Sequence, residues 1–487
     1  MISCCFRDTY GVLSDTEATA VVLGKVFERF AEYSPVTVMM RGIMEYVVPR
    51  ERLDEIFREQ AQEQYEDELL FSSAVNVLAL AVTGVRKSVN DAYKAERENL
   101  QVSVVSVYNK LKGTEIQVSR EIVRDVAARL IPVIDRLKTR GTPLLPGYRT
   151  KILDGNHLAA TEHRIKETRT TNSAPLPGKA LVVLEPELRL MTDVFPCEDG
   201  HAQERRLLDQ VLATVCSDDL WIADRNFCTT EFLFEIDNRE ATFIIRQHGL
   251  TLTDKRLCGR KRKIGRCDGG TVYEQTLRIS NRNATEAEPT EMDLRRITVK
   301  LDSSTRDGDR EIHILTNLPE EAADAITIAE LYRKRWKIEN AFQELGQALR
   351  GEINTLCYPK AALLAFCIAL YTYNVFSVLK HAMRAAYKDA AAIDRISGYY
   401  LAAEISAAYF GMMIAIPADK WTKAFAHLTP RQLATILRQL AANIRLDQFL
   451  KNIRGPKKPP PKRKSAKNAP HVSTKRLLDQ RKQNASP

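Results

Sequence analysis

The feature that most limits the possible folds is a change in hydrophobic period near residue 141. Ahead of it, apolar residues recur at spacings of three and four, as in residues 51–63, 68–82 and 120–137, which predicts amphipathic helices. After the glycine- and proline-rich residues 141–147, apolar residues gather in short runs that are typical of strands. The sequence therefore predicts a helical region first and an α/β region after it.

Five of the short runs are predicted to be strands: 149–153, 180–184, 188–194, 220–223 and 241–247. A helix is expected between the third and the fourth, over residues 201–215. Asp154 follows the first predicted strand and Asp224 follows the fourth. Functional groups of open α/β sheets gather at the carboxyl ends of strands, so both aspartates are candidate site residues. Asp218 and Asp219 precede the fourth strand and are poorer candidates.

A third carboxylate lies in residues 331–350, LYRKRWKIENAFQELGQALR, which are predicted to form one helix. At about 100° per residue, Tyr332, Arg335 and Glu339 fall on one narrow arc of that helix. The neighbouring arc must face a core, because it is apolar: Leu331, Ile338, Phe342, Leu345 and Leu349. Alone, an Arg335 to Glu339 pair would be read as a solvated surface contact. The two aspartates favour a site where three carboxylates share a pair of hard cations instead.

The order of these acids resembles that of a known protein family, the DDE transposases of bacterial insertion sequences of the insertion-sequence-four type. The segment ILDGN around Asp154 is similar to the family's first aspartate box, and ADRNF around Asp224 is similar to the second. Glu339 comes third, as in the family. The resemblance extends roughly over residues 40–455.

The helix of the third acid resembles the family signature Tyr-x2-Arg-x3-Glu-x6-Lys. Tyr332, Arg335 and Glu339 match its first three members in register. Gly346 stands where the lysine that contacts DNA is expected. Arg350, one predicted helical turn further on, is a candidate to replace that lysine.

The resemblance implies an enzyme that binds terminal inverted repeats, cleaves the DNA at the ends of its element and joins them to target DNA. The implied catalytic and metal-binding residues are Asp154, Asp224 and Glu339. They would hold two Mg²⁺ ions, for which Mn²⁺ can substitute, with Asp154 bridging both. The implied DNA contacts from the signature helix are Tyr332, Arg335 and Arg350. The partners would be double-stranded DNA and a second copy of the chain in a synaptic homodimer.

The family also implies the fold class, an α/β ribonuclease-H-like catalytic domain with an all-β insertion, preceded by a helical domain. Residues 250–320 are strand-like and turn-rich and are predicted to be the insertion. Its basic run 255–266, which includes Arg262, is a candidate phosphate-contacting face, with a solvated hairpin as the alternative. The predicted domains are 1–140, which is helical, and 141–455, which is catalytic. By composition the helical domain could bind DNA ends or be only a scaffold, and the resemblance favours DNA-end binding.

The net charge of +10 comes from one end of the chain. Residues 454–487 hold eleven Lys and Arg against one acid, so the remainder holds 61 basic and 61 acidic residues. Proline and charge leave residues 456–487 little to bury, which predicts a disordered basic tail that attracts DNA nonspecifically.

Two further features bear on location. Residues 361–379 are apolar over about the length that spans a bilayer, but their polar residues and the lack of a second span favour a buried core helix. The nine scattered cysteines are predicted to be free thiols in a reducing compartment. We expect a cytoplasmic, bacterial, nucleoid-associated protein with no membrane contact, and, without a P-loop or GxGxxG motif, no nucleotide cofactor.

Two other functions stay open. A transposase-derived DNA-binding regulator without catalysis would fit the glycine at position 346. A ribonuclease-H-like nuclease that acts on DNA junctions would use the same three acids on a different substrate.

Overall fold

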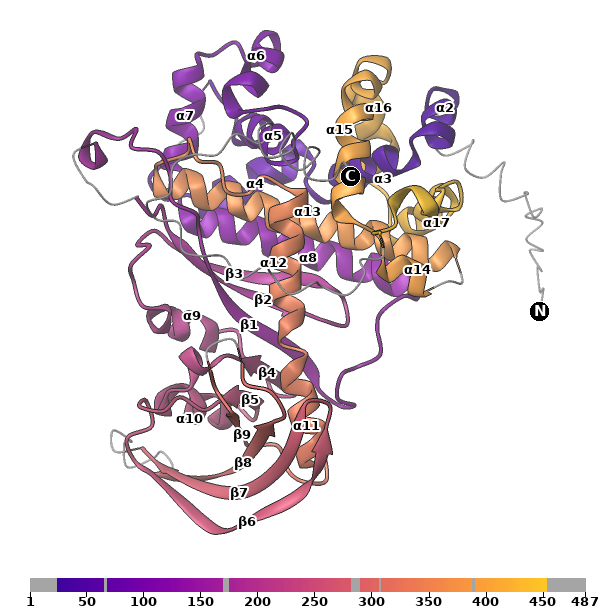
Figure 1. The fold of residues 1–487 in the computed structure, drawn as a ribbon. Coiled ribbons are helices and arrows are strands. Elements are labelled where there is room, and N and C mark those ends of the chain that lie inside the picture. Colours follow the sequence, from indigo (N-terminus) through magenta and orange to yellow (C-terminus); the bar gives the residue numbers. More distant parts are fainter. Residues whose placement is uncertain are drawn as a thin grey trace, which may run out of the picture. The chain divides into compact units, whose positions relative to one another are not determined.

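A nine-stranded sheet and a large group of helices make up the compact unit that ends at Leu450 (Figure 1). The computed structural model describes residues 24–64, 68–169, 175–281, 290–305, 308–387 and 390–452. The predicted basic tail, 456–487, lies outside the described residues.

The strands confirm the five predicted runs, and four more lie in the segment predicted to be strand-like over residues 250–320. They are β1 (Arg149–His157), β2 (Lys179–Glu185), β3 (Leu190–Cys197), β4 (Asp219–Ala223), β5 (Thr242–Arg246), β6 (Lys255–Cys267), β7 (Gly270–Ser280), β8 (Glu291–Leu301) and β9 (Glu311–Thr316). Their order across the sheet is β3-β2-β1-β4-β5-β9-β8-β7-β6. The pairs β1 with β4 and β4 with β5 are parallel, and the other pairs are antiparallel. The fold is thus mixed α/β with a mostly antiparallel sheet.

The strand-rich segment predicted over residues 250–320 forms β6 to β9. These strands do not make a separate sheet, because β9 pairs with β5 through Ile244 with Thr316 and Ile245 with Leu315. The segment therefore extends the central sheet, and β6 becomes its edge strand. The basic run of residues 255–266 lies on this edge.

The helices fall into three sets along the chain. Before β1 come α2 (Lys25–Tyr33), α3 (Pro35–Val47), α4 (Arg50–Gln60), α5 (Phe71–Val82), α6 (Val89–Leu100), α7 (Val104–Gly113) and α8 (Ile116–Leu137). Beside the sheet lie α9 (Leu208–Leu212), α10 (Thr230–Asn238), α11 (Ala325–Arg333) and α12 (Trp336–Ala348). After them come α13 (Pro359–Ala386), α14 (Ala390–Asp394), α15 (Gly398–Ala415), α16 (Ala418–Trp421) and α17 (Pro430–Ala442). The helix predicted over 201–215 is shorter, because a 3-10 turn (Glu204–Leu207) precedes α9.

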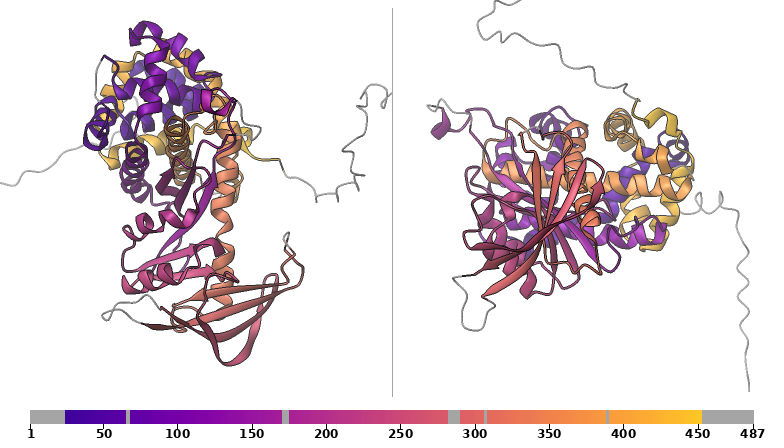
Figure 2. Two further views of the ribbon diagram at one scale, coloured as in Figure 1. Left: turned by 90° about the vertical axis from the view of Figure 1, so that its left-hand side faces the viewer. Right: turned by 60° about the horizontal axis from the view of Figure 1, so that its bottom comes forward.

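Helices from both ends of the chain pack together in one group (Figure 2). The long helix α13 contacts α8 and α17, and α8 also contacts the edge strand β3. Among the described residues α13 is the helix that is long and apolar enough to cross a membrane, yet 94% of its most apolar window is buried in the protein. The prediction of a buried core helix is confirmed.

A polar side chain in the middle of α13 ties the helix to the sheet. The amide of Asn374 is fully buried, accepts a hydrogen bond from the N–H of Met191 at 2.8 Å and donates one to its carbonyl at 2.8 Å. Met191 lies in the edge strand β3, whose outer backbone groups would otherwise lack partners. The asparagine therefore supplies hydrogen-bond partners for Met191 at this edge of the sheet.

The seven cysteines of the described ranges are free thiols, as predicted: Cys197, Cys216, Cys228, Cys258, Cys267, Cys357 and Cys367.

A buried histidine on α13 is expected to make the stability of the fold depend on pH. His381 lies between the carbonyl of Leu188 at 2.9 Å and the hydroxyl of Thr139 at 2.9 Å. The carbonyl can only accept, so Nε2 of the ring carries the proton. In the neutral ring Nδ1 then accepts a hydrogen bond from the Thr139 hydroxyl. Burial lowers the pKa of His381 to about 4.

Because the pKa is lower in the folded than in the unfolded chain, the unfolded chain binds the proton more readily below pH 6.5. Stability is complete above that pH and falls towards pH 4, by at most about 1.4 kcal/mol per pH unit. Urea unfolding at pH 7.5 and pH 5 measures this slope. His381→Gln should reduce it, whereas the same change at the exposed His201 should leave it intact; equal slopes in all three proteins would contradict the assignment.

Candidate active site

Asp154 and Asp224 lie side by side at the carboxyl end of the parallel pairing between β1 and β4. The last parallel pair of β1 and β4 joins Leu153 to Ala223, and each aspartate is the next residue of its strand's chain. Asp224 directly follows β4, as predicted, and precedes a 3-10 turn (Arg225–Phe227). The prediction that Asp154 ends its strand is wrong, because β1 continues to His157 by pairing with β2 alone. Its position at the end of the parallel pairing places it beside Asp224 nonetheless.

Glu339 comes from the first turn of α12, next to a break that the sequence did not predict. The helix expected over residues 331–350 is divided into α11 and α12, which follow one another along one column (Figure 1). At the break, the N–H of Lys337 bonds to the carbonyl of Lys334 at 2.9 Å, and the N–H of Ile338 to that of Arg335 at 3.1 Å. Bonds between residues three apart tighten the turn in the manner of a 3-10 helix. The chain keeps its direction, so the signature residues remain together.

The predicted apolar arc of this helix is confirmed. Leu331, Ile338, Leu345 and Leu349 are buried, and Phe342 is partly buried. Through this face α12 packs on β1, α13 and α15. Glu339 therefore stands at the edge of a packed surface, with its side chain half exposed.

Arg335 lies between the first and the third carboxylates. Its Nη1 donates to Oδ2 of Asp154 at 2.8 Å and its Nη2 donates to Oε1 of Glu339 at 2.6 Å. Only 11% of the arginine side chain is exposed, and its Nε is buried without a hydrogen-bond partner in the described structure. The guanidinium thus supplies positive charge where these carboxylates meet.

The charges of the three acids are coupled. Burial raises the pKa of Asp154 to about 6. The guanidinium of Arg335 and the N–H of Gly155 oppose this effect, because both lower the pKa. Asp224 and Glu339 raise it further, so both lie close enough for their charges to be felt. Such a concentration of negative charge around a buried carboxylate fits a site for divalent cations, which prefer oxygen ligands. Within the described ranges, however, no three His, Cys, Asp or Glu side chains already form a closed metal cluster.

Tyr332 lies close to Arg335. Its side chain is buried, and burial raises the pKa of its hydroxyl to about 12, with Arg335 and Asp224 among the charges that act on it. The phenol is therefore neutral at ordinary pH and can help to orient the guanidinium.

Arg350 was predicted to lie one turn further along the signature helix. This prediction is wrong, because α12 ends at Ala348. Leu349 is extended, and the N–H of Arg350 bonds to the carbonyl of Val82 at 2.7 Å. The side chain turns towards Lys87, whose carbonyl lies 3.4 Å from its Nη1. Arg350 thus does not join the three carboxylates.

Arg262 also lies apart from the three carboxylates, on the edge strand β6. It donates to Glu274 at 3.1 Å, and its side chain is 60% exposed. A DNA contact by Arg262 would therefore be made by the edge of the sheet.

A fourth acid near the aspartates was missed in the sequence. The carboxylate of Glu204 accepts from the amide of Asn226 at 3.3 Å and lies over Gly155, where a Cβ atom would come within 2.3 Å of its Oε1. Glu204 is 50 residues from Asp154 in the chain, and the only local signal is the glycine that leaves room for it.

A basic rim beside Asp224 was missed as well. Burial lowers the pKa of His248, Arg205 and Arg225 lower it further, and Asp224 opposes them, so the two arginines and the aspartate lie near His248.

The two ends of β4 carry aspartates with different roles. Asp219, at the start of the strand, is buried and paired with the equally buried Lys151 at 2.7 Å. We expect Asp219→Asn to lower the free energy of unfolding by about 3 kcal/mol, because it leaves a buried ammonium unpaired. The same substitution at Asp224, which has no ion pair in the described structure, should cost less than about 1 kcal/mol. Urea unfolding of both variants checks this, and equal losses would refute it.

Comparisons with known proteins concern the same part of the chain. Residues 145–375 match the family model of the transposase DDE domain, and all three carboxylates lie within the matched residues. Enzymes of this family cut and join DNA with the help of divalent metal ions. No curated protein matches the chain significantly.

Six chains of solved structures match significantly. One is the piggyBac transposase in a cryo-EM structure of its synaptic complex with hairpin DNA, with a TM-score of 0.36 and 10% identity. That match covers 84% of this chain and 83% of the other.

Proposed function

We propose that this chain is an insertion-sequence transposase of the insertion-sequence-four type, which binds terminal inverted repeats, cleaves the DNA at the element ends and joins them to target DNA. The observation that supports this most is the gathering of Asp154, Asp224 and Glu339 around Arg335 inside the matched DDE domain. The regulator without catalysis is the weaker alternative, because all three acids are present and near one another.

The topology supports a ribonuclease-H-like core as part of this proposal. The strand order β3-β2-β1-β4-β5, with β1, β4 and β5 parallel, is the arrangement we assign to it. Strands β6 to β9 then form the β insertion, and the helices before residue 141 form the DNA-end-binding domain.

The proposed metal ligands are Asp154, Asp224 and Glu339. When bound, two Mg²⁺ ions stabilise the attacking and leaving oxygens of an in-line displacement on phosphorus. Few carboxylates, completed by water and phosphate oxygens, suit the preference of Mg²⁺. The buried, charge-crowded surroundings of Asp154 support this assignment.

The proposed role of Arg335 is to hold a DNA phosphate near the cleaved bond. A guanidinium that already makes two charge-assisted hydrogen bonds can make a forked contact with two phosphate oxygens in their place. Tyr332 would help to hold the guanidinium of Arg335 in position. Arg205 and Arg225 would attract the same strand on the side of Asp224.

Outside the candidate site, the exposed basic edge strand β6 with Arg262 would contact DNA backbone, and two copies of the chain would pair two element ends. Such contacts depend on salt, since they release counterions from DNA.

The test uses the full-length protein and a duplex that carries the inverted repeats flanking its own gene. With Mg²⁺ the protein should nick the duplex at the repeat's end, and chelation of the metal should stop this. A duplex with a scrambled repeat and a four-way junction are the matched substrates. Binding of the repeat without nicking would favour the regulator, and preference for the junction would favour the nuclease.

A further inference from the structure

The two candidate aspartates lie where their strands separate. The parallel pairing of β1 with β4 ends at Leu153 with Ala223, and β1 then continues to His157 beside β2 alone. In the described structure, therefore, no backbone pairing of β1 with β4 extends to Asp154 and Asp224. Contacts from another element are needed to fix the distance between these two residues.

A short turn between β3 and β4 is placed to make such contacts. The 3-10 turn (Glu204–Leu207) begins with Glu204, whose side chain is only 13% exposed. Leu207, at the other end of the turn, is buried in one apolar cluster with Leu153 and Ala223, which precede the two aspartates. This packing holds the turn against the ends of both strands.

Glu204 contacts both aspartate segments. Its Oε2 accepts a hydrogen bond from the amide of Asn226 at 3.3 Å, and its Oε1 lies 3.9 Å from Nδ1 of His157 at the end of β1. Asn226 belongs to the turn that follows the second aspartate. The next residue of the 3-10 turn, Arg205, donates to the carbonyl of Asn226 at 2.9 Å. Glu204 therefore bridges the end of β1 and the turn after β4.

Gly155 brings the glutamate close to the first aspartate. A Cβ atom at this position would lie 2.3 Å from Oε1 of Glu204, and its three nearest heavy atoms would all belong to Glu204. The N–H of Gly155 in turn donates to Oδ1 of Asp154 at 2.9 Å. A shift of Gly155 would therefore move the hydrogen bond that holds the Asp154 carboxylate.

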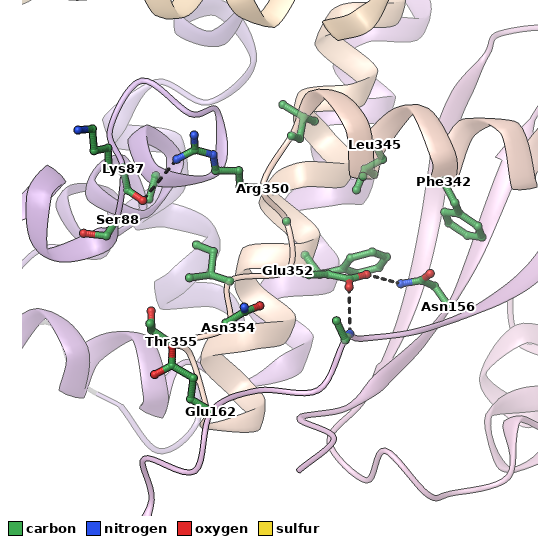
Figure 3. Close-up of a pocket in the computed structure, with 17 residues that line it drawn as sticks. Lys87, Ser88, Asn156, Glu162, Phe342, Leu345, Arg350, Glu352, Asn354 and Thr355 are labelled. Atoms are coloured by element: carbon green, nitrogen blue, oxygen red, sulfur yellow. Dashed lines mark hydrogen bonds between the residues drawn. The ribbon is translucent and has the colours of Figure 1, made fainter. Parts of the chain in front are cut away.

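Glu204 lies on the opposite face of β1 from the Asp154 carboxylate. Side chains of a strand alternate between its two faces, so Asp154 and Asn156 share one face. On that face the amide of Asn156 donates to Glu352 at 3.3 Å (Figure 3). Gly155 lies between them in the chain, and its open side faces Glu204. Because the glutamate is on the other face, it is suited to position the aspartates rather than to bind ions with them.

We propose that Glu204 is a positioning residue, which fixes the separation of Asp154 and Asp224 so that both can hold a divalent ion. It acts through its contacts with Gly155 and Asn226. The proposal rests on the function proposed above. Removal of partners that orient metal-binding side chains typically weakens metal binding by about ten- to a hundredfold.

The first measurement is Mn²⁺ binding to the full-length protein without DNA, by calorimetry. Glu204→Ala should weaken binding about tenfold, because the bridge between the two aspartate segments is lost. Glu204→Gln should stay within about twofold of the wild type, since its side chain keeps the size and an oxygen that accepts from Asn226. Glu198→Ala, which removes an exposed acid shortly before the turn, is the matched control and should bind as the wild type does.

Gly155→Ala tests the same contact from the other side. The added Cβ atom displaces the Glu204 carboxylate, so Mn²⁺ binding should weaken about as much as in Glu204→Ala. In the Glu204→Ala background the same change meets no carboxylate and should weaken binding no further. Equal losses in the two backgrounds would overturn the proposal.

Nicking of the terminal-repeat duplex over a series of Mn²⁺ concentrations gives a second readout. The three proposed ligands remain in Glu204→Ala, so its rate at saturating Mn²⁺ should be close to that of the wild type. The Mn²⁺ concentration that gives half of this rate should rise about tenfold. If Glu204→Gln loses as much binding as Glu204→Ala, the charge of Glu204 is used directly and the positioning role is wrong.

The proposal also fails if Glu204→Ala binds Mn²⁺ as tightly as Glu198→Ala while the wild type nicks the duplex. A wild-type protein that neither binds Mn²⁺ nor nicks its terminal repeats would instead refute the function on which the proposal rests.

Discussion

Asp154→Asn, Asp224→Asn and Glu339→Gln are each expected to slow nicking of the terminal-repeat duplex by about a thousandfold, or about 4 kcal/mol in the activation barrier. Each change removes one negative charge and one oxygen ligand while it keeps the size of the side chain. Binding of the duplex should persist, because DNA affinity comes from cationic groups elsewhere. Single-turnover nicking rates at saturating protein, with binding measured separately, check both parts.

The control for these variants is Glu330→Gln, which neutralises an exposed acid on α11. It should nick at the wild-type rate. Retained nicking in any of the three site variants would remove that residue from the catalytic set. Thermal unfolding distinguishes a lost ligand from a lost fold, since Asp224→Asn and Glu339→Gln should unfold close to the wild type. Asp154→Asn, which breaks the ion pair with Arg335, should be less stable by at most about 2 kcal/mol and still fold.

The three acids could be predicted from the sequence because their signals are local. Asp154 and Asp224 follow short apolar runs, and Glu339 belongs to a spaced signature on an amphipathic helix. Parallel pairing of β1 with β4 then places the aspartates at one edge. What the local pattern could not reveal is that Arg335 would lie between Asp154 and Glu339, because that contact joins residues 181 positions apart.

The errors concern features without a local signal. Helix α3 was not predicted, and its burial on nearly every side leaves few polar residues to mark an exposed face. The break between α11 and α12 occurs without glycine or proline, the usual markers of helix ends.

Tertiary contacts account for the remaining differences. Arg350 leaves the helix axis because its N–H pairs with Val82, and β6 to β9 join the central sheet because β9 pairs with β5. Both contacts connect distant parts of the chain, which hydrophobic periods cannot indicate.

Arg335→Gln is expected to bind Mn²⁺ more tightly than the wild type when DNA is absent. The guanidinium now pairs with both Asp154 and Glu339, so a cation must compete with it for the same oxygens. Without DNA the arginine has no phosphate to move to, and its removal frees both carboxylates. Titration of the metal by calorimetry measures the change, and equal or weaker binding by the variant would contradict this role.

The stability of the same variant gives a second, independent measurement. Loss of Arg335 leaves the largely buried Asp154 without its ion-pair partner, which should lower the free energy of unfolding by about 2 kcal/mol in metal-free buffer. Mn²⁺ at about one hundred times its dissociation constant should return about 2.7 kcal/mol. The wild type, in which Arg335 already pairs with two of the carboxylates, should gain less. Arg335→Lys, which keeps the positive charge, should gain about as little as the wild type, so that the gain from metal follows the charge left beside Asp154.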